Sequence, residues 1–251
     1  MALWKVVLIL VTGTAAGFLN VVGGGGSLLS MPMLIFLGLP SALANGTNRV
    51  ALMVQNIVAV MNFRSKGFFD LKLSLTLGIP ALIGSIAGSQ IAISLPDHIF
   101  NRILGLVMFL VLFLIVKQPQ QKIVTQDDEN FNPDKKVQAI IAFFFVGLYG
   151  GFIQAGVGFI IIAALTIITG MSLVRINSLK VFIVGFYMLS SLLVFIISGN
   201  VNWVLGLTLA VGNSLGAWLG SNFAVSKGDK WIRYILIITV CAMALKLLFN
   251  F

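Results

Sequence analysis

Charged residues are scarce in this sequence. Only 9% of its 251 residues are Asp, Glu, Lys or Arg, whereas an ordinary soluble domain carries roughly 25%. Hydrophobic residues make up 59% of the chain, and the mean hydropathy is +1.08. A soluble fold of this size could not keep so much apolar surface away from water. The composition therefore excludes a soluble enzyme or binding domain and predicts an integral membrane protein surrounded by a lipid bilayer.

Residues that usually carry catalysis or bind metals are also few. Cys241 lies in an apolar run and His98 in a predicted loop, and each is the only residue of its type. The seven acids all fall in predicted loops or at the ends of apolar runs: Asp70, Asp97, Asp127, Asp128, Glu129, Asp134 and Asp229. The sequence also lacks the phosphate-binding loop of nucleotide-driven pumps. We therefore predict no catalytic residue, no metal and no cofactor.

The formal net charge of +9 would suggest a nucleic-acid partner in a soluble protein. Here most of the Lys and Arg residues lie in short loops next to apolar runs. Such loops determine how a membrane protein is oriented in the bilayer. We therefore expect no nucleic-acid partner.

The hydrophobic residues gather in runs, and a run needs about 20 helical residues to cross a bilayer core. The predicted helical segments are 3–22, 27–38, 43–63, 71–95, 99–116, 137–154, 159–170, 173–198, 203–225 and 231–249. Two of them, 27–38 and 159–170, are too short to cross as straight helices. We therefore expect an all-α integral membrane protein with about 8–10 transmembrane segments, including short broken or re-entrant helices.

The only clearly polar stretch, 117–136, divides the chain into a first transmembrane repeat, 1–116, and a second, 137–251. A shift of 132 residues along the sequence places Gly84 on Gly216 and Gly88 on Gly220. Neighbouring Thr, Ser and Asp positions coincide in the same alignment. Similar composition alone does not align glycine and polar positions, so we predict an internal duplication.

Loop charge indicates how the two repeats are oriented. The loop 64–72 carries three Lys or Arg residues, and its counterpart 199–203 carries none. The next pair has the opposite bias, with one such residue in 96–102 and three in 227–233. Because cytoplasmic loops collect Lys and Arg, equivalent loops are expected on opposite sides of the membrane. We therefore predict inverted repeats in a cell membrane, with the linker in the cytoplasm and both termini outside.

Glycine clusters follow the first helical segment of each half. Four consecutive glycines cannot continue a stable helix, since each costs about 1 kcal/mol relative to Ala. Unpaired backbone at membrane depth survives only inside protein or beside a wet cavity, where the next helix presents its positive end to an anion. Close helix packing through small residues is the alternative explanation. The candidate substrate-binding residues here are Asn20, Gly23, Gly24, Gly25, Gly26, Ser27, Gln154, Gly156 and Gly158.

Each half then carries small polar residues followed by one cation at the start of a long helical segment. The candidate substrate-binding residues of this second group are Asn45, Thr47, Asn48, Arg49, Asn177, Ser178 and Lys180. We treat Arg49 and Lys180 as counterparts in the two halves. A cation within a membrane segment needs a partner or a function, unless it reaches the interface from a helix end.

The pattern of Gly23 to Gly26, then Pro32, Gly38-Leu39-Pro40 and Ala44 to Arg49, resembles the TauE/SafE family of membrane permeases. The resemblance covers nearly the whole chain. It implies export of a small sulfur-containing anion such as sulfite or an organosulfonate. The second half departs from the pattern, because Gly156-Val157-Gly158 replaces the full glycine run.

From the residues and the resemblance together we predict a permease that exports a small anion by alternating access. An anion channel, or a permease for another organic anion such as a carboxylate, would use the same helix ends and cations. The sequence is compatible with a homodimer but does not indicate one.

Overall fold

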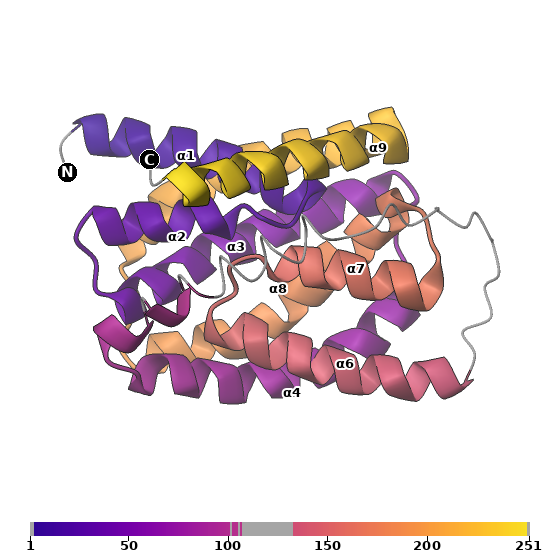
Figure 1. The fold of residues 1–251 in the computed structure, drawn as a ribbon, viewed down its shortest axis with the longest axis horizontal. Helices are drawn as coiled ribbons and strands as arrows, with labels where there is room; N and C mark the ends of the chain where they lie inside the picture. The colour runs from indigo at the N-terminus through magenta and orange to yellow at the C-terminus, as the bar shows by residue number, and fades with distance from the viewer. Residues whose placement is uncertain (1–2, 101, 105, 107–132, 250–251) are drawn as a thin grey trace.

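A computed structural model describes residues 3–249 apart from 101, 105 and 107–132 (Figure 1). The described part is helical and contains no strand. Its helices are α1 (Leu3–Val22), α2 (Ser27–Phe36), α3 (Ser41–Ser65), α4 (Leu71–Ser94), α6 (Pro133–Phe152), α7 (Val157–Thr169), α8 (Leu173–Ile197) and α9 (Trp203–Phe249). The predicted segment 99–116 lies largely outside the described residues, and so does most of the predicted linker 117–136. Helix α6 begins at Pro133, within that predicted linker.

Four described helices are long and apolar enough to cross a membrane: Leu3–Val22, Leu71–Ser94, Leu173–Ile197 and Trp203–Ile232. Helix α3 has 25 residues but falls short in hydropathy, because Asn45, Asn48, Arg49 and three further amides lie along it. Most of its polar side chains are buried. The all-α membrane fold is therefore confirmed, and α3 is one of the helices that bring polar groups into its interior.

Helix α9 combines two predicted segments. The backbone at Gly228 leaves the helical conformation, with φ 70° and ψ −171°. The sequence predicts a break over residues 226–230, so the interruption falls where it is expected. Only glycine adopts this conformation readily, which explains the residue at the kink.

The two short helices follow directly on longer ones. Helices α2 and α7 have 10 and 13 residues, which corresponds to about 15 and 20 Å of length at the usual helical rise. A bilayer core is about 30 Å thick, so neither helix crosses it alone. Together with the preceding helix, each forms a broken pair: α1 with α2, and α6 with α7.

The packing of the helices repeats between the two halves. Helix α1 packs against α9 on one side of the molecule, and α4 packs against α6 on the other (Figure 1). Helix α3 also contacts α9, and its counterpart α8 contacts α4. Glycines allow these close approaches: a β-carbon on Gly216 would overlap the backbone at Thr14, and one on Gly84 would overlap the backbone at Phe144. Small residues at helix interfaces serve this purpose in membrane proteins.

Carboxylates stand at the N-termini of the two long central helices. Asp97 accepts a hydrogen bond from the backbone N–H of Ser41 (2.9 Å), at the start of α3. Asp229 accepts from the N–H groups of Leu173 (3.0 Å) and Val174 (3.2 Å), at the start of α8. A negative charge stabilises the positive end of a helix. The same device therefore anchors both helices that carry the buried cations.

Candidate substrate-binding site

Both broken pairs are interrupted at a C-terminal helix cap. The N–H groups of Gly23 and Gly24 both donate to the carbonyl of Leu19 (2.7 and 2.8 Å), and Gly24 has φ +88°. In the second half Gln154 takes the same place, with φ +65° and its N–H bonded to the carbonyl of Tyr149 (3.3 Å). A positive φ is uncommon for a residue other than glycine. The helices thus end as the glycine clusters predict, although in the second half a glutamine occupies the strained position.

The two breaks cross each other in the centre of the protein. A β-carbon on Gly24 would overlap the backbone at Gly158, and a β-carbon on Gly158 would overlap the backbone at Gly24. Neither position has room for a side chain. The turn between α1 and α2 therefore meets the first turn of α7.

Arg49 crosses from α3 to the end of α6. Its side chain is fully buried, and its guanidinium group donates to the carbonyls of Gly150 (3.1 Å) and Gly151 (2.5 Å). It also donates to Oδ1 of Asn45 (3.1 Å) and Oε1 of Gln154 (3.3 Å). The last carbonyls of a helix have no partner within the helix and carry partial negative charge. Arg49 therefore caps the C-terminus of a helix that belongs to the other half.

Lys180 makes the reciprocal contact from α8 to the end of α1. Its Nζ donates to the carbonyl of Val21 (2.8 Å) and to Oδ1 of Asn177 (2.6 Å). The Asn177 amide donates in turn to the carbonyl of Val22 (3.1 Å), just as Asn45 donates to the carbonyl of Phe152 (2.8 Å). Each half therefore supplies one cation and one asparagine to the broken helix of the other half.

The two cations are counterparts in their contacts but not in the sequence alignment. A shift of 132 residues places Lys180 on Asn48, one residue before Arg49. Lysine follows its asparagine by three positions and arginine by four, and both spacings lie on one face of a helix. Asn48 itself bonds to Ser30 (2.7 Å).

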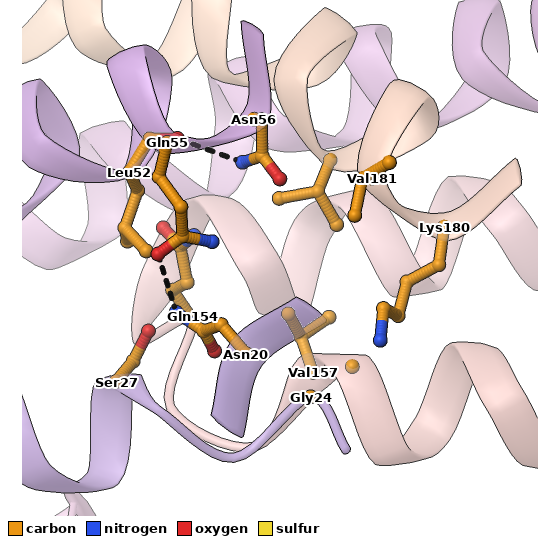
Figure 2. Close-up of a pocket in the computed structure, with 12 residues that line it drawn as sticks. Asn20, Gly24, Ser27, Leu52, Gln55, Asn56, Gln154, Val157, Lys180 and Val181 are labelled. Atoms are coloured by element: carbon orange, nitrogen blue, oxygen red, sulfur yellow. Dashed lines mark hydrogen bonds between the residues drawn. The ribbon is translucent and has the colours of Figure 1, made fainter. Parts of the chain in front are cut away.

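A cavity of about 20 Å³ lies beside the crossing of the breaks (Figure 2). It is lined by Asn20, Gly24, Ser27, Leu52, Gln55, Asn56, Gln154, Val157, Gly158, Lys180, Val181 and Val184. This volume accommodates about one water molecule and no oxyanion. Lys180 is the one residue among the lining residues whose side chain can carry a positive charge, and none of them is acidic.

A chain of amides runs along one wall of this cavity. The backbone N–H of Gly26 donates to Oδ1 of Asn20 (2.9 Å), and Nδ2 of Asn20 donates to Oε1 of Gln55 (3.2 Å). Asn213 of α9 donates to the same Gln55 oxygen (3.1 Å). With its oxygen occupied twice, Gln55 directs its amide nitrogen toward the side of the cavity where Lys180 lies (Figure 2).

Six of the predicted site residues line the cavity: Asn20, Gly24, Ser27, Gln154, Gly158 and Lys180. Gly26 lies next to it and donates its backbone N–H to Asn20. Other predicted site residues do not line the cavity and instead hold helices and loops together. Thr47 accepts from the backbone N–H of Asn202 (2.9 Å), and the Ser178 hydroxyl donates to the carbonyl of Phe68. Asn45 and Arg49 hold the end of α6, and Gly156, at the start of α7, has φ +76°. The remaining glycines, Gly23 and Gly25, form the turn between α1 and α2.

Sequence reasoning missed Gln55, Asn56 and Asn213. The first two are amides within the predicted membrane segment 43–63, where buried polar groups are costly unless paired. That rarity was the available signal. Among the residues that the structure describes, no three His, Cys, Asp or Glu side chains come together to hold a metal ion.

These features define a helical membrane protein with a small interior cavity between two broken helix pairs, lined in part by amide side chains and one lysine. The chain matches the family described as sulfite exporter TauE/SafE over residues 9–247, and it belongs to that family. It is therefore a membrane transporter of the TauE/SafE family.

Its relatives carry matching descriptions. The chain is 29% identical over 238 residues to a protein of Escherichia coli (strain K12) named probable membrane transporter protein YfcA, covering 94% of this chain and 86% of the relative. It is 25% identical over 233 residues to the probable membrane transporter protein ORF9 of a Sinorhizobium species, covering 93% and 88%. A probable membrane transporter protein of Haemophilus influenzae is 26% identical, with 95% and 92% covered. No solved structure matches the chain.

Proposed function

We propose that this transporter exports a small anion, sulfite or an organosulfonate, and that the anion binds in an enlarged form of the central cavity. The observation that carries the proposal is the set of groups around the cavity: the Lys180 ammonium, the Gln55 amide nitrogen and the N-terminal ends of two helices. All of them stabilise negative charge. The TauE/SafE family name supplies the sulfur-containing cargo.

The substrate needs more room than the cavity offers. Because its walls come from both broken pairs and from α3 and α8, a shift of one half relative to the other would enlarge it. We propose alternating access on this basis, with the crossing of Gly24 and Gly158 as the fixed centre. Inverted repeats with a site between broken helices are typical of secondary transporters.

Of the two buried cations, we assign the substrate contact to Lys180. It lines the cavity, whereas the contacts of Arg49 are with the end of α6. Arg49 instead holds the second broken pair in place. The two halves therefore have different roles. Their sequences differ as well, since Gly156-Val157-Gly158 stands in the second half where the first half has four consecutive glycines.

An anion leaving a cell with a negative interior gains about 2.3 kcal/mol per charge for each 100 mV. Export then requires no coupling ion. The test is sulfite flux from proteoliposomes whose potential is set with potassium and valinomycin. We expect saturable efflux that rises when the interior is negative and falls when the potential is reversed.

The controls separate the alternatives. Flux that ignores the potential would refute potential-driven export, and single-channel currents would replace the carrier by an anion channel. Acetate transport without sulfite transport would point to a carboxylate permease. Liposomes with the Lys180→Met variant should show little flux, while liposomes without protein report leakage.

The orientation in the membrane is a separate proposal, with the linker 117–136 in the cytoplasm and both termini outside. Single cysteines placed at Gly67 and Gly199, after replacement of Cys241 by Ala, lie in equivalent loops. We expect a membrane-impermeant maleimide to label only Gly199→Cys in intact cells. Labelling of both from outside would contradict the inversion.

A further inference from the structure

Two amides beside the cavity have orientations that backbone groups dictate. A backbone N–H can only donate, so the bond from Gly26 fixes Oδ1 of Asn20 as an acceptor. Nδ2 of Asn20 must then be the atom that faces Gln55, and Gln55 must present its oxygen to it. The Gln55 amide nitrogen is therefore left to face the cavity as a donor.

The Asn56 side chain also has a fixed orientation, but it presents an acceptor rather than a donor. Its Nδ2 donates to the carbonyl of Leu52 (2.8 Å), one turn earlier on α3. A carbonyl can only accept, so Oδ1 of Asn56 is the atom that turns away from Leu52, and Asn56 lines the cavity (Figure 2). The wall formed by α3 thus offers one donor and, one residue later, one acceptor.

Asn213 also fixes the orientation of the Gln55 amide, but it leaves one of its own polar atoms without a partner. Its Nδ2 bonds to Oε1 of Gln55, but its own Oδ1 is buried without a hydrogen-bond partner among the described residues. An unsatisfied buried acceptor is unfavourable and is rare in native structures. The compensating gain is a Gln55 oxygen held from two sides, which leaves the amide no alternative orientation.

The second half does not repeat this arrangement. At the shift of 132 residues, Tyr187 and Met188 stand opposite Gln55 and Asn56, and Ala81 stands opposite Asn213. The Tyr187 hydroxyl lies over Gly150, where a β-carbon would overlap it. The amide pair is therefore a property of the first half and not a requirement of the repeated fold.

From this placement we propose that Gln55 and Asn56 determine substrate specificity. The preferred cargo is a singly charged oxyanion that also carries one hydrogen-bond donor, an O–H or N–H, for Oδ1 of Asn56. Lys180 and Gln55 bind the anionic oxygens. The inference rests on the proposed function, because it names the class of anion that the same cavity accepts.

A matched pair of ligands tests the idea. Isethionate and ethanesulfonate have the same sulfonate charge and nearly the same size, but only isethionate carries a hydroxyl group. We expect the purified protein to bind isethionate about tenfold more tightly, the scale of one well-placed hydrogen bond. Isothermal titration of both ligands into the detergent-solubilised full chain measures this ratio.

Variants at the acceptor complete the test. Asn56→Leu should reduce the ratio to about one, mainly by weakening isethionate binding. Asn56→Met, which introduces the side chain found at the equivalent position of the second half, should do the same and serves if the leucine variant does not fold. Asn62→Leu, on α3 but bonded to Ser221 rather than lining the cavity, should keep the ratio of the parent protein.

The outcomes are distinguishable. Equal affinities for both ligands in the parent protein, or a preference that survives both Asn56 substitutions, would overturn the specificity proposal and leave anion export intact. Binding of neither ligand, together with no binding of sulfite, would instead overturn the proposed function.

Discussion

Gly24 and Gly158 touch backbone to backbone at the centre of the protein, where the turn between α1 and α2 meets the first turn of α7. Neither glycine has space for even one additional carbon atom. Because the neighbouring atoms are backbone, a β-carbon there cannot be accommodated by turning a side chain away. We therefore predict that Gly158→Ala separates the two breaks and abolishes transport, with a loss of stability of about 2 kcal/mol or more.

The control for this substitution is a glycine in open space. Gly67 has φ +80°, and a β-carbon there would meet no atom within 4 Å. Asparagine tolerates that backbone conformation, so Gly67→Asn should retain flux and lose less than about 1 kcal/mol. Melting temperature in detergent and sulfite flux in liposomes check both variants. Normal flux in Gly158→Ala would show that the crossing is not the centre of the mechanism.

The reciprocal caps give a prediction that separates the two cations. Arg49→Met removes the donors for the Gly150 and Gly151 carbonyls inside the protein, so we expect a loss of roughly 2–5 kcal/mol in stability. Lys180→Met removes a single ammonium group from the Val21 carbonyl and should cost about 1–3 kcal/mol. Lys180→Met should in addition lose anion binding.

Two measurements decide between these roles: the melting temperature without ligand, and its increase on adding sulfite. A ligand at about 100 times its Kd stabilises the folded state by roughly 2.7 kcal/mol. If the Arg49→Met variant folds, sulfite should still raise its melting temperature. Sulfite should not raise the melting temperature of the Lys180→Met variant. The reverse result would place the substrate at Arg49.

Removal of the fixed donor on α3 gives a third prediction. Gln55→Leu keeps the size of the side chain but leaves Asn20 and Asn213 without their shared acceptor. We expect weaker binding of every anion, by about tenfold or more, since a hydrogen bond to a charged group is worth roughly 1.5–3 kcal/mol. Titration with sulfite and with isethionate should show similar losses. A loss confined to isethionate would assign the hydroxyl contact to Gln55 instead of Asn56.

Helix positions were predictable because each apolar run has a clear polar or glycine boundary. The predicted segment 3–22 coincides with α1, and 173–198 differs from α8 by one residue. The break at Gly23 to Gly26 also followed from composition, since four glycines cannot remain helical. Local rules were sufficient for these features.

The partners of the buried polar residues were not predictable. Nothing in the sequence around Arg49 indicates that it reaches the carbonyl groups of a helix about one hundred residues further along the chain, because that contact depends on how the halves are packed. Amides at Gln55 and Asn56 are unusual in an apolar segment, but for the same reason the sequence does not indicate what they contact. The periodicity of a helix shows which residues share a face, but not what that face contacts.

The carboxylates at the helix starts allow a final prediction about stability. Asp229 accepts two backbone N–H groups at the start of α8, whereas Asp97 accepts the N–H of Ser41 at the start of α3. Asp229→Ala should therefore cost about 1–2 kcal/mol, as for other lost helix caps, and Asp97→Ala about 1 kcal/mol or less. Asp229→Asn keeps an accepting oxygen and loses only the charge, so its cost should be about 0.3–1 kcal/mol.

Melting temperatures of the three variants in the same detergent test this order. Lys180 lies two helical turns beyond Leu173, roughly 10 Å along α8, so sulfite affinity should change less than twofold in any variant that folds. If Asp229→Ala melted like the parent protein, water would be replacing the carboxylate at the helix start. A large loss of sulfite affinity at unchanged stability would instead mean that Asp229 acts on the cavity through the position of α8.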